Sequence, residues 1–135
     1  MTAILIDSNV LLDVMTEDAR WFSWSGGAIE RAADRFRLVI NPVIYAEVSV
    51  RYSRIEELDD ALPKTMFDRE AIPYAAAFLA GKSFLLYRQR GGTRRSPLPD
   101  FFIGAHAAVA GYRLMTRNAA RYRTYFPKLP LVAPG

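Results

Sequence analysis

The segment at residues 4–9 constrains the fold of this chain most strongly. Three apolar residues, two of them β-branched, lead directly into Asp7, and an apolar pattern with helical spacing follows. This order predicts a buried strand at residues 4–7 and a helix at residues 9–15, with a carboxylate at the turn between them. Ligands of open α/β sheets bind outside the carboxyl ends of the strands, so Asp7 either caps the helix or belongs to a site.

The same alternation of strand and helix continues along the chain. Apolar runs predict further strands at residues 38–40, 64–67, 112–115 and 131–132. Helical patterns separate them, at residues 19–36, 42–52, 54–62, 69–87, 99–110 and 119–125. We therefore expect one α/β domain over residues 1–135, with a central parallel sheet of four or five strands in the order 3-2-1-4-5 and helices on both faces.

Composition limits the classes to which the chain can belong. It has 135 residues and no cysteine, which excludes disulfide bonds and cysteine-ligated zinc and suits a reducing compartment. The most apolar segment, residues 71–87, contains Pro73 and Lys82 and is too short to cross a bilayer. No basic segment precedes the first apolar run, as it would in a signal peptide. We expect a cytoplasmic protein without a membrane segment.

Charge is distributed unevenly along the chain. Residues 1–81 contain 13 acidic and 8 basic side chains, whereas residues 82–135 contain 10 basic side chains and one acid, Asp100. A positive field of this kind attracts phosphate groups, so a nucleic acid is the expected partner. The alternative is a solvated surface that is rich in arginine.

Three acids stand in apolar or basic surroundings. Asp7 ends an apolar strand, Glu47 lies in a mostly apolar helix, and Asp100 begins an apolar helix in the basic half. Converging carboxylates repel one another unless a hard divalent cation joins them, and oxygen ligands select Mg²⁺ or Mn²⁺ over zinc. Each acid also has a structural alternative, since Asp7 and Asp100 could cap helices and Glu47 could pair with an arginine. Together the three acids favour a metal site that acts on a phosphodiester.

Four segments share their order and spacing with a known family. They are residues 6–13 (IDSNVLLD), 45–48 (YAEV), 98–107 (LPDFFIGAHA) and 114–118 (LMTRN). The ordered set spans nearly the whole chain. It resembles the motifs of PIN-domain ribonucleases, and among these the VapC-type toxins of type II toxin–antitoxin pairs.

The resemblance implies a PIN-like three-layer fold and a Mg²⁺-dependent endoribonuclease that cleaves RNA with a metal-activated water. It implies that Asp7, Glu47 and Asp100 are the catalytic and metal-binding residues. It also implies a cognate antitoxin that covers the site, and a toxin homodimer. Many members carry a fourth acid after the fourth strand, where this chain has Asn118, so sites with one metal and with two metals both stay open.

Four polar residues are candidates for a supporting role. Ser8 and Thr116 flank the site and could bind a carboxylate or water, or could instead cap helices. Asn9 is expected to order the first helical turn, and Asn118 offers a carbonyl oxygen without charge.

Two further residues are not assigned to the site. Asp13 and His106 each follow a site acid by six residues, a spacing that turns them away on a helix. We expect Asp13 at the surface or in a salt bridge, and His106 in a structural role.

Six arginines are candidates for RNA contacts. Four of them lie in a glycine-containing loop before Asp100 and could equally be solvated, and two follow the fourth strand and could instead neutralise the acids. They are Arg88, Arg90, Arg94 and Arg95 in the loop, and Arg117 and Arg121 after the strand.

Three other functions are alternatives to a nuclease. A non-catalytic RNA- or protein-binding module on the same fold is the main alternative, prompted by the uncharged Asn118. A phosphatase with Asp7 as nucleophile is disfavoured, because Asn9 stands where such enzymes usually have a second carboxylate. A dinucleotide-binding role is disfavoured, because no Gly-x-Gly-x-x-Gly segment follows a strand.

Overall fold

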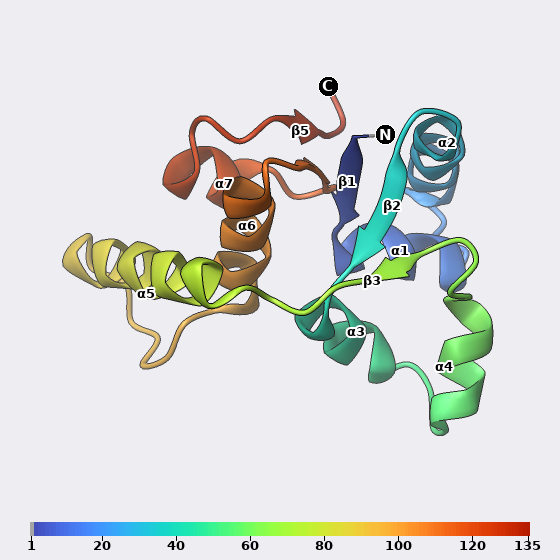
Figure 1. The fold of residues 1–135 in the computed structure, drawn as a ribbon, viewed down its shortest axis with the longest axis horizontal. Helices are drawn as coiled ribbons and strands as arrows, with labels where there is room; N and C mark the ends of the chain where they lie inside the picture. The colour runs from blue at the N-terminus through green and yellow to red at the C-terminus, as the bar shows by residue number, and fades with distance from the viewer. Residues whose placement is uncertain (1) are drawn as a thin grey trace.

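The structure, a computed structural model, describes residues 2–135, which form five strands and seven helices (Figure 1). The strands are β1 (Ala3–Ile6), β2 (Arg37–Ile40), β3 (Asp68–Arg69), β4 (Arg113–Met115) and β5 (Leu131–Val132). The helices are α1 (Ser8–Met15), α2 (Phe22–Ala33), α3 (Pro42–Ser49), α4 (Ile55–Ala61), α5 (Tyr74–Gln89), α6 (Pro99–Ala110) and α7 (Ala120–Tyr125). All strand pairs are parallel, and the order β3-β2-β1-β4-β5 confirms the predicted α/β topology.

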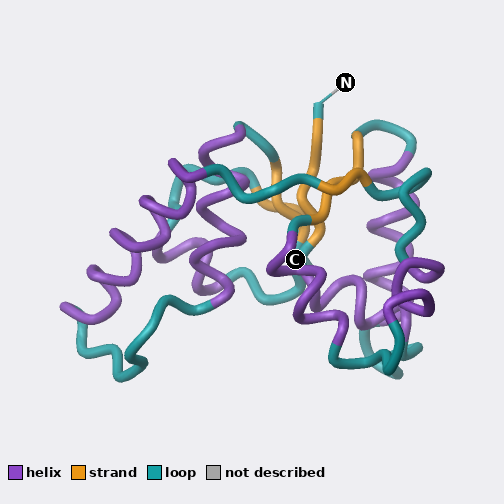
Figure 2. The backbone as a smooth tube through the Cα atoms, turned by 60° about the horizontal axis from the view of Figure 1, so that its bottom comes forward, coloured by secondary structure: helices purple, strands orange, loops and turns teal. Residues whose placement is uncertain are grey.

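The central strand of the sheet is β1, which is apolar on both faces. Leu5 pairs with Val39 of β2 and with Leu114 of β4, and all three side chains are buried. Uninterrupted apolar strands suit a sheet covered on both sides. In Figure 1, α2 lies on one side of the sheet and α6 and α7 lie on the other, and Figure 2 shows the strands between two groups of helices. Because β1 and β4 pair in parallel, their carboxyl ends are neighbours.

A close contact fixes α7 against α6. Gly104 of α6 lacks a side chain, and a Cβ atom there would lie 2.5 Å from Cε2 of Phe126, the residue that follows α7. Gly111 then ends α6 in the left-handed conformation, with φ of 74°, at the predicted end of the helix at residue 110. None of the helices in residues 2–135 has the length and apolarity needed to cross a membrane.

Two predicted boundaries at the sheet edge are wrong. Residues 64–66 form a turn rather than a strand, and the edge strand is Asp68–Arg69. The backbone N–H of Glu70 continues the pairing by donating to the carbonyl of Ile40 at 3.0 Å. The helix predicted from residue 69 therefore begins at Tyr74, directly after Pro73. Proline disfavours the helical conformation in the residue before it, so the chain stays extended up to this point.

Three predicted helices are too long. The helix predicted over residues 19–36 is Phe22–Ala33, because the Asp18 carboxylate accepts the backbone N–H groups of Arg20 and Trp21 at 2.9 and 2.8 Å and holds a turn there. The helix predicted over residues 42–52 ends at Ser49, and the one over residues 54–62 is Ile55–Ala61. Local hydrogen bonds of this kind compete with helix formation.

Candidate active site

Asp7 caps α1 and also lies at the centre of a buried hydrogen-bond network. Its Oδ1 accepts the backbone N–H of Ser8 at 2.7 Å. Its Oδ2 accepts the hydroxyl groups of Thr116 at 2.8 Å and of Tyr122 at 2.9 Å, and the residue is 3% exposed. The two alternatives for Asp7, a helix cap and a site residue, are therefore compatible, because each carboxylate oxygen serves one of them.

Asp100 lies next to Asp7 across the hydroxyl of Tyr122. Asp100 is in the first turn of α6, and Leu98 holds the cap position, so the alternative that Asp100 caps this helix is wrong. Its Oδ1 lies 3.4 Å from the Tyr122 hydroxyl, and its Oδ2 accepts a hydrogen bond from Nη1 of Arg121 at 3.2 Å. A hydroxyl group carries one proton, so Tyr122 donates to one carboxylate at a time, and the shorter distance favours Asp7.

Glu47 joins the site through Ser8. The Ser8 hydroxyl donates to Oε1 of Glu47 at 2.8 Å and lies 3.5 Å from Oδ1 of Asp7. Within residues 2–135 no arginine forms a salt bridge with Glu47, so the alternative of a structural ion pair is wrong for this acid. The three candidate acids, from the end of β1, from α3 and from α6, are thus connected by two hydroxyl groups.

The three acids affect one another electrostatically. Burial is the main cause that raises the pKa of Asp7, and the charge of Asp100 adds to it, while hydrogen bonds from Thr116 and Tyr122 lower it in part. Burial also raises the pKa of Glu47, with smaller contributions from the charges of Asp7 and Asp100. Burial and the charges of the acids raise the pKa of Tyr122, which therefore keeps its proton and acts as a donor. The site is acidic, partly desolvated and under mutual repulsion.

The donor set fits a hard divalent cation. Its candidate ligands are carboxylate and hydroxyl oxygens, which suit Mg²⁺ or Mn²⁺. Asp7 and Asp100 would hold the cation, and Glu47 lies beyond Ser8 on the other side of Asp7. Within residues 2–135 no group of three acidic or histidine side chains is placed to hold a metal ion, so the predicted ligand set of Asp7, Glu47 and Asp100 is not assembled in this structure. The fit of the site to a divalent cation therefore depends on the oxygen ligands that these acids offer and on the repulsion between their carboxylates.

Polar residues in the first turn of α1 and directly after β4 hold this arrangement together. Asn9 contacts Oγ1 of Thr116 at 3.3 Å and Oδ2 of Asp7 at 3.4 Å through its side-chain nitrogen, and its oxygen accepts the backbone N–H of Arg117 at 3.0 Å. Asn118 donates its backbone N–H to Oγ1 of Thr116 at 3.2 Å, and its side chain is exposed. Thr116 and Asn9 thus contact the site acid directly, whereas Asn118 contributes its backbone.

The Arg117 guanidinium contacts Asp13 and none of the three candidate site acids. Its Nε and Nη2 donate to the two carboxylate oxygens of Asp13 at 2.7 and 3.0 Å, and the Ser25 hydroxyl also donates to Asp13 at 2.7 Å. Asp13 is 2% exposed. Of the two expectations for Asp13, the salt bridge is confirmed and the surface position is wrong. Arg117 therefore neutralises Asp13, while Arg121 pairs with Asp100.

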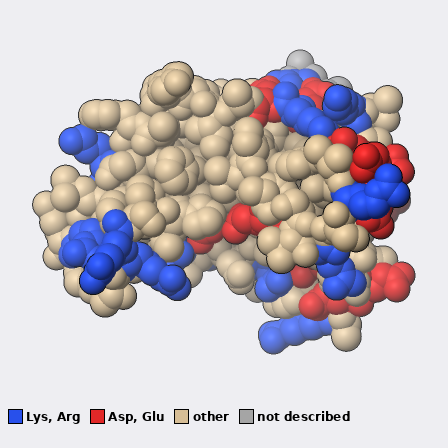
Figure 3. Space-filling view, turned by 90° about the horizontal axis from the view of Figure 1, so that it is seen from below, with Lys and Arg blue, Asp and Glu red and all other residues tan. Residues whose placement is uncertain are grey.

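The four arginines predicted in the loop are exposed, but the loop position is wrong for Arg88, which lies in the last turn of α5; Arg90 is the C-cap of α5, and Arg94 and Arg95 lie between α5 and α6. Arg88 donates to the carbonyl oxygen of Arg94 at 2.8 Å, and the Arg90 guanidinium lies over the ring of Tyr125. Figure 3 shows a face of the molecule with acidic atoms in a central hollow and basic side chains on both sides. This charge pattern suits a chain of phosphates that crosses an acidic centre.

Tyr122 is the site residue that sequence reasoning missed. Its fractional exposure is 1%, and it contacts two candidate acids. The available signal was a tyrosine within a short helix, since a buried tyrosine hydroxyl needs a hydrogen-bond partner. His106, by contrast, has the expected structural surroundings: it is fully buried, and its Nδ1 lies 3.0 Å from Nδ2 of Asn41.

A model of the PIN domain matches residues 4–127 of the sequence. The chain belongs to the PIN domain family. Among curated proteins, no sequence matches that of this PIN domain.

Solved structures share the fold of this PIN domain over nearly its whole length. VapBC2 from Rickettsia felis, bound to a DNA fragment from its promoter, has a TM-score of 0.75 at 16% identity, and the match covers 99% of this chain and 100% of the other. VapBC-1 from nontypeable Haemophilus influenzae has a TM-score of 0.73 at 17% identity, with 98% of both chains covered. A toxin–antitoxin complex from Klebsiella pneumoniae has a TM-score of 0.66 at 24% identity, with 98% of both chains covered.

Proposed function

We propose that this PIN domain is a Mg²⁺-dependent endoribonuclease and the toxin of a type II toxin–antitoxin pair. The observation that carries the proposal is the contact of Asp7, at the end of β1, and Asp100, in the first turn of α6, with one hydroxyl group, that of Tyr122. Two carboxylates that contact the same hydroxyl group, with Glu47 joined through Ser8, form an anionic site that a divalent cation stabilises.

The residues of the site have separate tasks in this proposal. A bound Mg²⁺ would orient and acidify a water molecule for attack on the RNA phosphodiester. Asp7 and Asp100 bind the cation, and Thr116 and Tyr122 hold the Asp7 carboxylate in place. Glu47, whose pKa is raised, is suited to accept a proton at its carboxylate. Because Asn118 carries no charge, the proposed site holds one cation.

The basic residues are proposed to bind the RNA backbone. Arg121 is next to Asp100, four further arginines at the end of α5 and in the loop before α6 are exposed, and Figure 3 shows basic side chains on both sides of the acidic hollow. The four further arginines are Arg88, Arg90, Arg94 and Arg95. Arg117 is bound to Asp13, which neutralises its charge, so no direct contact with RNA is proposed for it.

The proposed protein partners are a cognate antitoxin and a second copy of the chain in the cytoplasm. The solved structures of similar fold are VapBC assemblies or a toxin–antitoxin complex, which supports an antitoxin as partner. The homodimer rests on the resemblance of the sequence motifs to VapC-type toxins.

A second candidate function is a non-catalytic RNA- or protein-binding module. One observation favours it, since Arg121 forms an ion pair with Asp100 and thereby neutralises part of the charge that a cation needs. This module would bind RNA in a salt-sensitive and metal-independent manner, without turnover.

The test is cleavage of single-stranded RNA by the purified chain with Mg²⁺ and with EDTA. We expect cleavage with Mg²⁺, loss with EDTA, and loss of at least about 100-fold in Asp7→Asn and Glu47→Gln. Glu30→Gln, an exposed change on α2, is the matched control and should cleave normally. Full activity of both site variants would sink the assignment, and metal-independent RNA binding without cleavage would favour the second candidate.

A further inference from the structure

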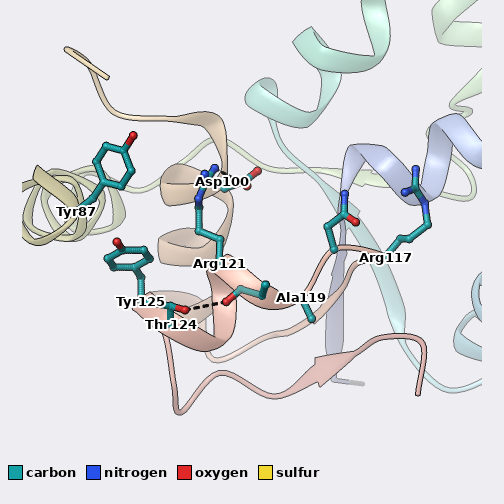
Figure 4. Close-up of a pocket in the computed structure, with 9 residues that line it drawn as sticks. Tyr87, Asp100, Arg117, Ala119, Arg121, Thr124 and Tyr125 are labelled. Atoms are coloured by element: carbon teal, nitrogen blue, oxygen red, sulfur yellow. Dashed lines mark hydrogen bonds and ion pairs between the residues drawn. The ribbon is translucent and has the colours of Figure 1, made fainter. Parts of the chain in front are cut away.

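A cavity of about 740 Å³ opens beside Asp100, between the end of α5 and the segment that contains α7 (Figure 4). Its volume falls in the range of roughly 300–1,000 Å³ that small-molecule sites have. The cavity begins at the acidic site and ends at a pair of tyrosines, Tyr87 and Tyr125. A substrate bound at the acidic site would therefore also cover this cavity.

The tyrosine end of the cavity is a fixed aromatic surface. The rings of Tyr87 and Tyr125 have centroids 6.5 Å apart at an angle of 62°, and Tyr125 packs edge-on against the buried Phe101 at 5.2 Å. The guanidinium of Arg90 lies 5.5 Å from the centroid of the Tyr125 ring. A cation thus already lies over the Tyr125 ring, which also lines the cavity.

Arg121 lies between this aromatic surface and Asp100. Arg121 and Tyr125 are four residues apart on α7 and therefore share a helix face. Figure 4 shows the Arg121 side chain extending toward Asp100. Its ion pair with Asp100 measures 3.2 Å, with side-chain exposures of 40% and 34%. An ion pair with this exposure is weak, so a phosphate can compete for the guanidinium.

We propose that this cavity binds one unpaired ribonucleotide next to the scissile phosphate, with its phosphate on Arg121 and its base against Tyr125 and Tyr87. The inference rests on the proposed function, because it names a part of the substrate of the same site. The order of chemical groups along the cavity is acid, cation and aromatic ring, which matches a reacting phosphate, a neighbouring phosphate and a base. An unpaired base has a free π-face for such stacking, whereas bases in a duplex stack on one another.

The test measures the contribution of the base separately from that of the phosphates. Fluorescence anisotropy in EDTA compares labelled hexaadenylate with a hexamer of abasic ribose phosphate of equal charge. The full chain should bind hexaadenylate about tenfold more tightly, as stacking of a base on an aromatic side chain provides. Tyr125→Leu should reduce this ratio at least threefold, whereas Tyr125→Phe, which keeps the ring, should retain it.

Charge variants provide the matched controls. Arg121→Gln should weaken binding of both probes by a similar factor of about three to ten, since it removes one phosphate contact. Arg123→Gln removes the same charge from the same helix but lies outside the cavity, so its effect should stay within about twofold. Equal affinity of the two probes for the unmodified chain would overturn the proposal, and so would an unchanged ratio in Tyr125→Leu. Either result is expected if the cavity instead holds a side chain of a partner protein.

A second measurement avoids mutation of the packed tyrosine. RNA that contains 4-thiouridine is irradiated with the unmodified chain in EDTA, and the cross-linked peptides are identified by mass spectrometry. Cross-links at Tyr87 or Tyr125 support the proposal, and cross-links confined to residues outside the cavity overturn it. Base-dependent binding without Mg²⁺-dependent cleavage supports this subsite and contradicts the nuclease proposal, whereas cleavage without base-dependent binding contradicts the subsite alone.

Discussion

The hydroxyl group of Tyr122 lies 2.9 Å from Oδ2 of Asp7 and 3.4 Å from Oδ1 of Asp100. One neutral donor thus stands between an acid at the end of β1 and an acid in the first turn of α6. The contact lowers the cost of placing a charge at Asp7, which is almost fully buried.

Removal of this hydroxyl group should destabilise the metal-free protein. Tyr122→Phe keeps the ring in the core but leaves Oδ2 of Asp7 with one donor fewer, and we expect a loss of about 1–3 kcal/mol in the free energy of unfolding at neutral pH. Urea denaturation in EDTA measures this. Tyr125→Phe removes a hydroxyl group from the same helix at a partly exposed ring and should change stability by less than about 0.5 kcal/mol. Equal effects of the two changes would contradict the role given to Tyr122.

Protonation of Asp7 should make the stability of the folded chain depend on pH. Because its pKa is raised by burial, the folded chain binds a proton at Asp7 more tightly than the unfolded chain does. This contribution is fully present below the ordinary value of 3.8 and is lost as the pH rises through the higher pKa of the folded state. In EDTA, the Tm of the unmodified chain relative to that of Asp7→Asn should therefore rise as the pH falls from 7 to 4. A constant difference would contradict the raised pKa, and Glu30→Gln should show no such trend.

Divalent cations should stabilise the folded chain. A cation present at ten times its Kd adds about 1.4 kcal/mol, which corresponds to a rise in Tm of roughly 5 °C for a domain of this size. Calorimetry with increasing Mg²⁺ or Mn²⁺ measures the shift, and EDTA should reverse it. Asp100→Asn should reduce the shift, while Glu30→Gln should not. An equal shift in all three proteins would place cation binding outside the acidic site.

The buried ion pair of Arg117 and Asp13 should matter more than that of Arg121 and Asp100. Arg117→Gln leaves the Asp13 carboxylate buried, with Ser25 as its remaining partner, and should cost about 3 kcal/mol. Arg121→Gln breaks a pair whose side chains are 40% and 34% exposed and should cost less than about 1 kcal/mol. Thermal denaturation compares the two changes, and a reversed order would contradict this assignment of Arg117.

Two glycines in helices should respond oppositely to alanine. Gly104→Ala places a Cβ atom 2.5 Å from the ring of Phe126 and should destabilise the protein by about 1–3 kcal/mol. Gly81→Ala, in α5, meets no atom within 4 Å and should stabilise it by about 0.5–1 kcal/mol through helix propensity. Urea denaturation of the two variants tests whether Gly104 is needed for the packing of α7 on α6.

Local sequence patterns determined the topology of this protein and the positions of its candidate acids along the chain. The run that ends at Asp7 predicts a central strand because both faces of that strand are buried, and the parallel order of the sheet follows from the alternation of strands and helices. Boundaries at Pro73 and Asp18 were predicted less well, because helical periodicity continues beyond the point where a proline or a side-chain hydrogen bond ends a helix.

Tertiary structure alone decided how the acids are connected. Tyr122 contacts Asp7 across 115 positions of sequence, and Ser8 contacts Glu47 across 39. Such contacts leave no periodic signal, because they depend on how two helices approach the ends of two strands, and this approach depends on packing such as that of Gly104 against Phe126. The sequence by itself therefore determined which residues carry charge and on which elements they lie. The packing of α6 and α7 decided that the Asp7 carboxylate accepts a hydrogen bond from a tyrosine hydroxyl and that the Asp100 carboxylate forms an ion pair with an arginine.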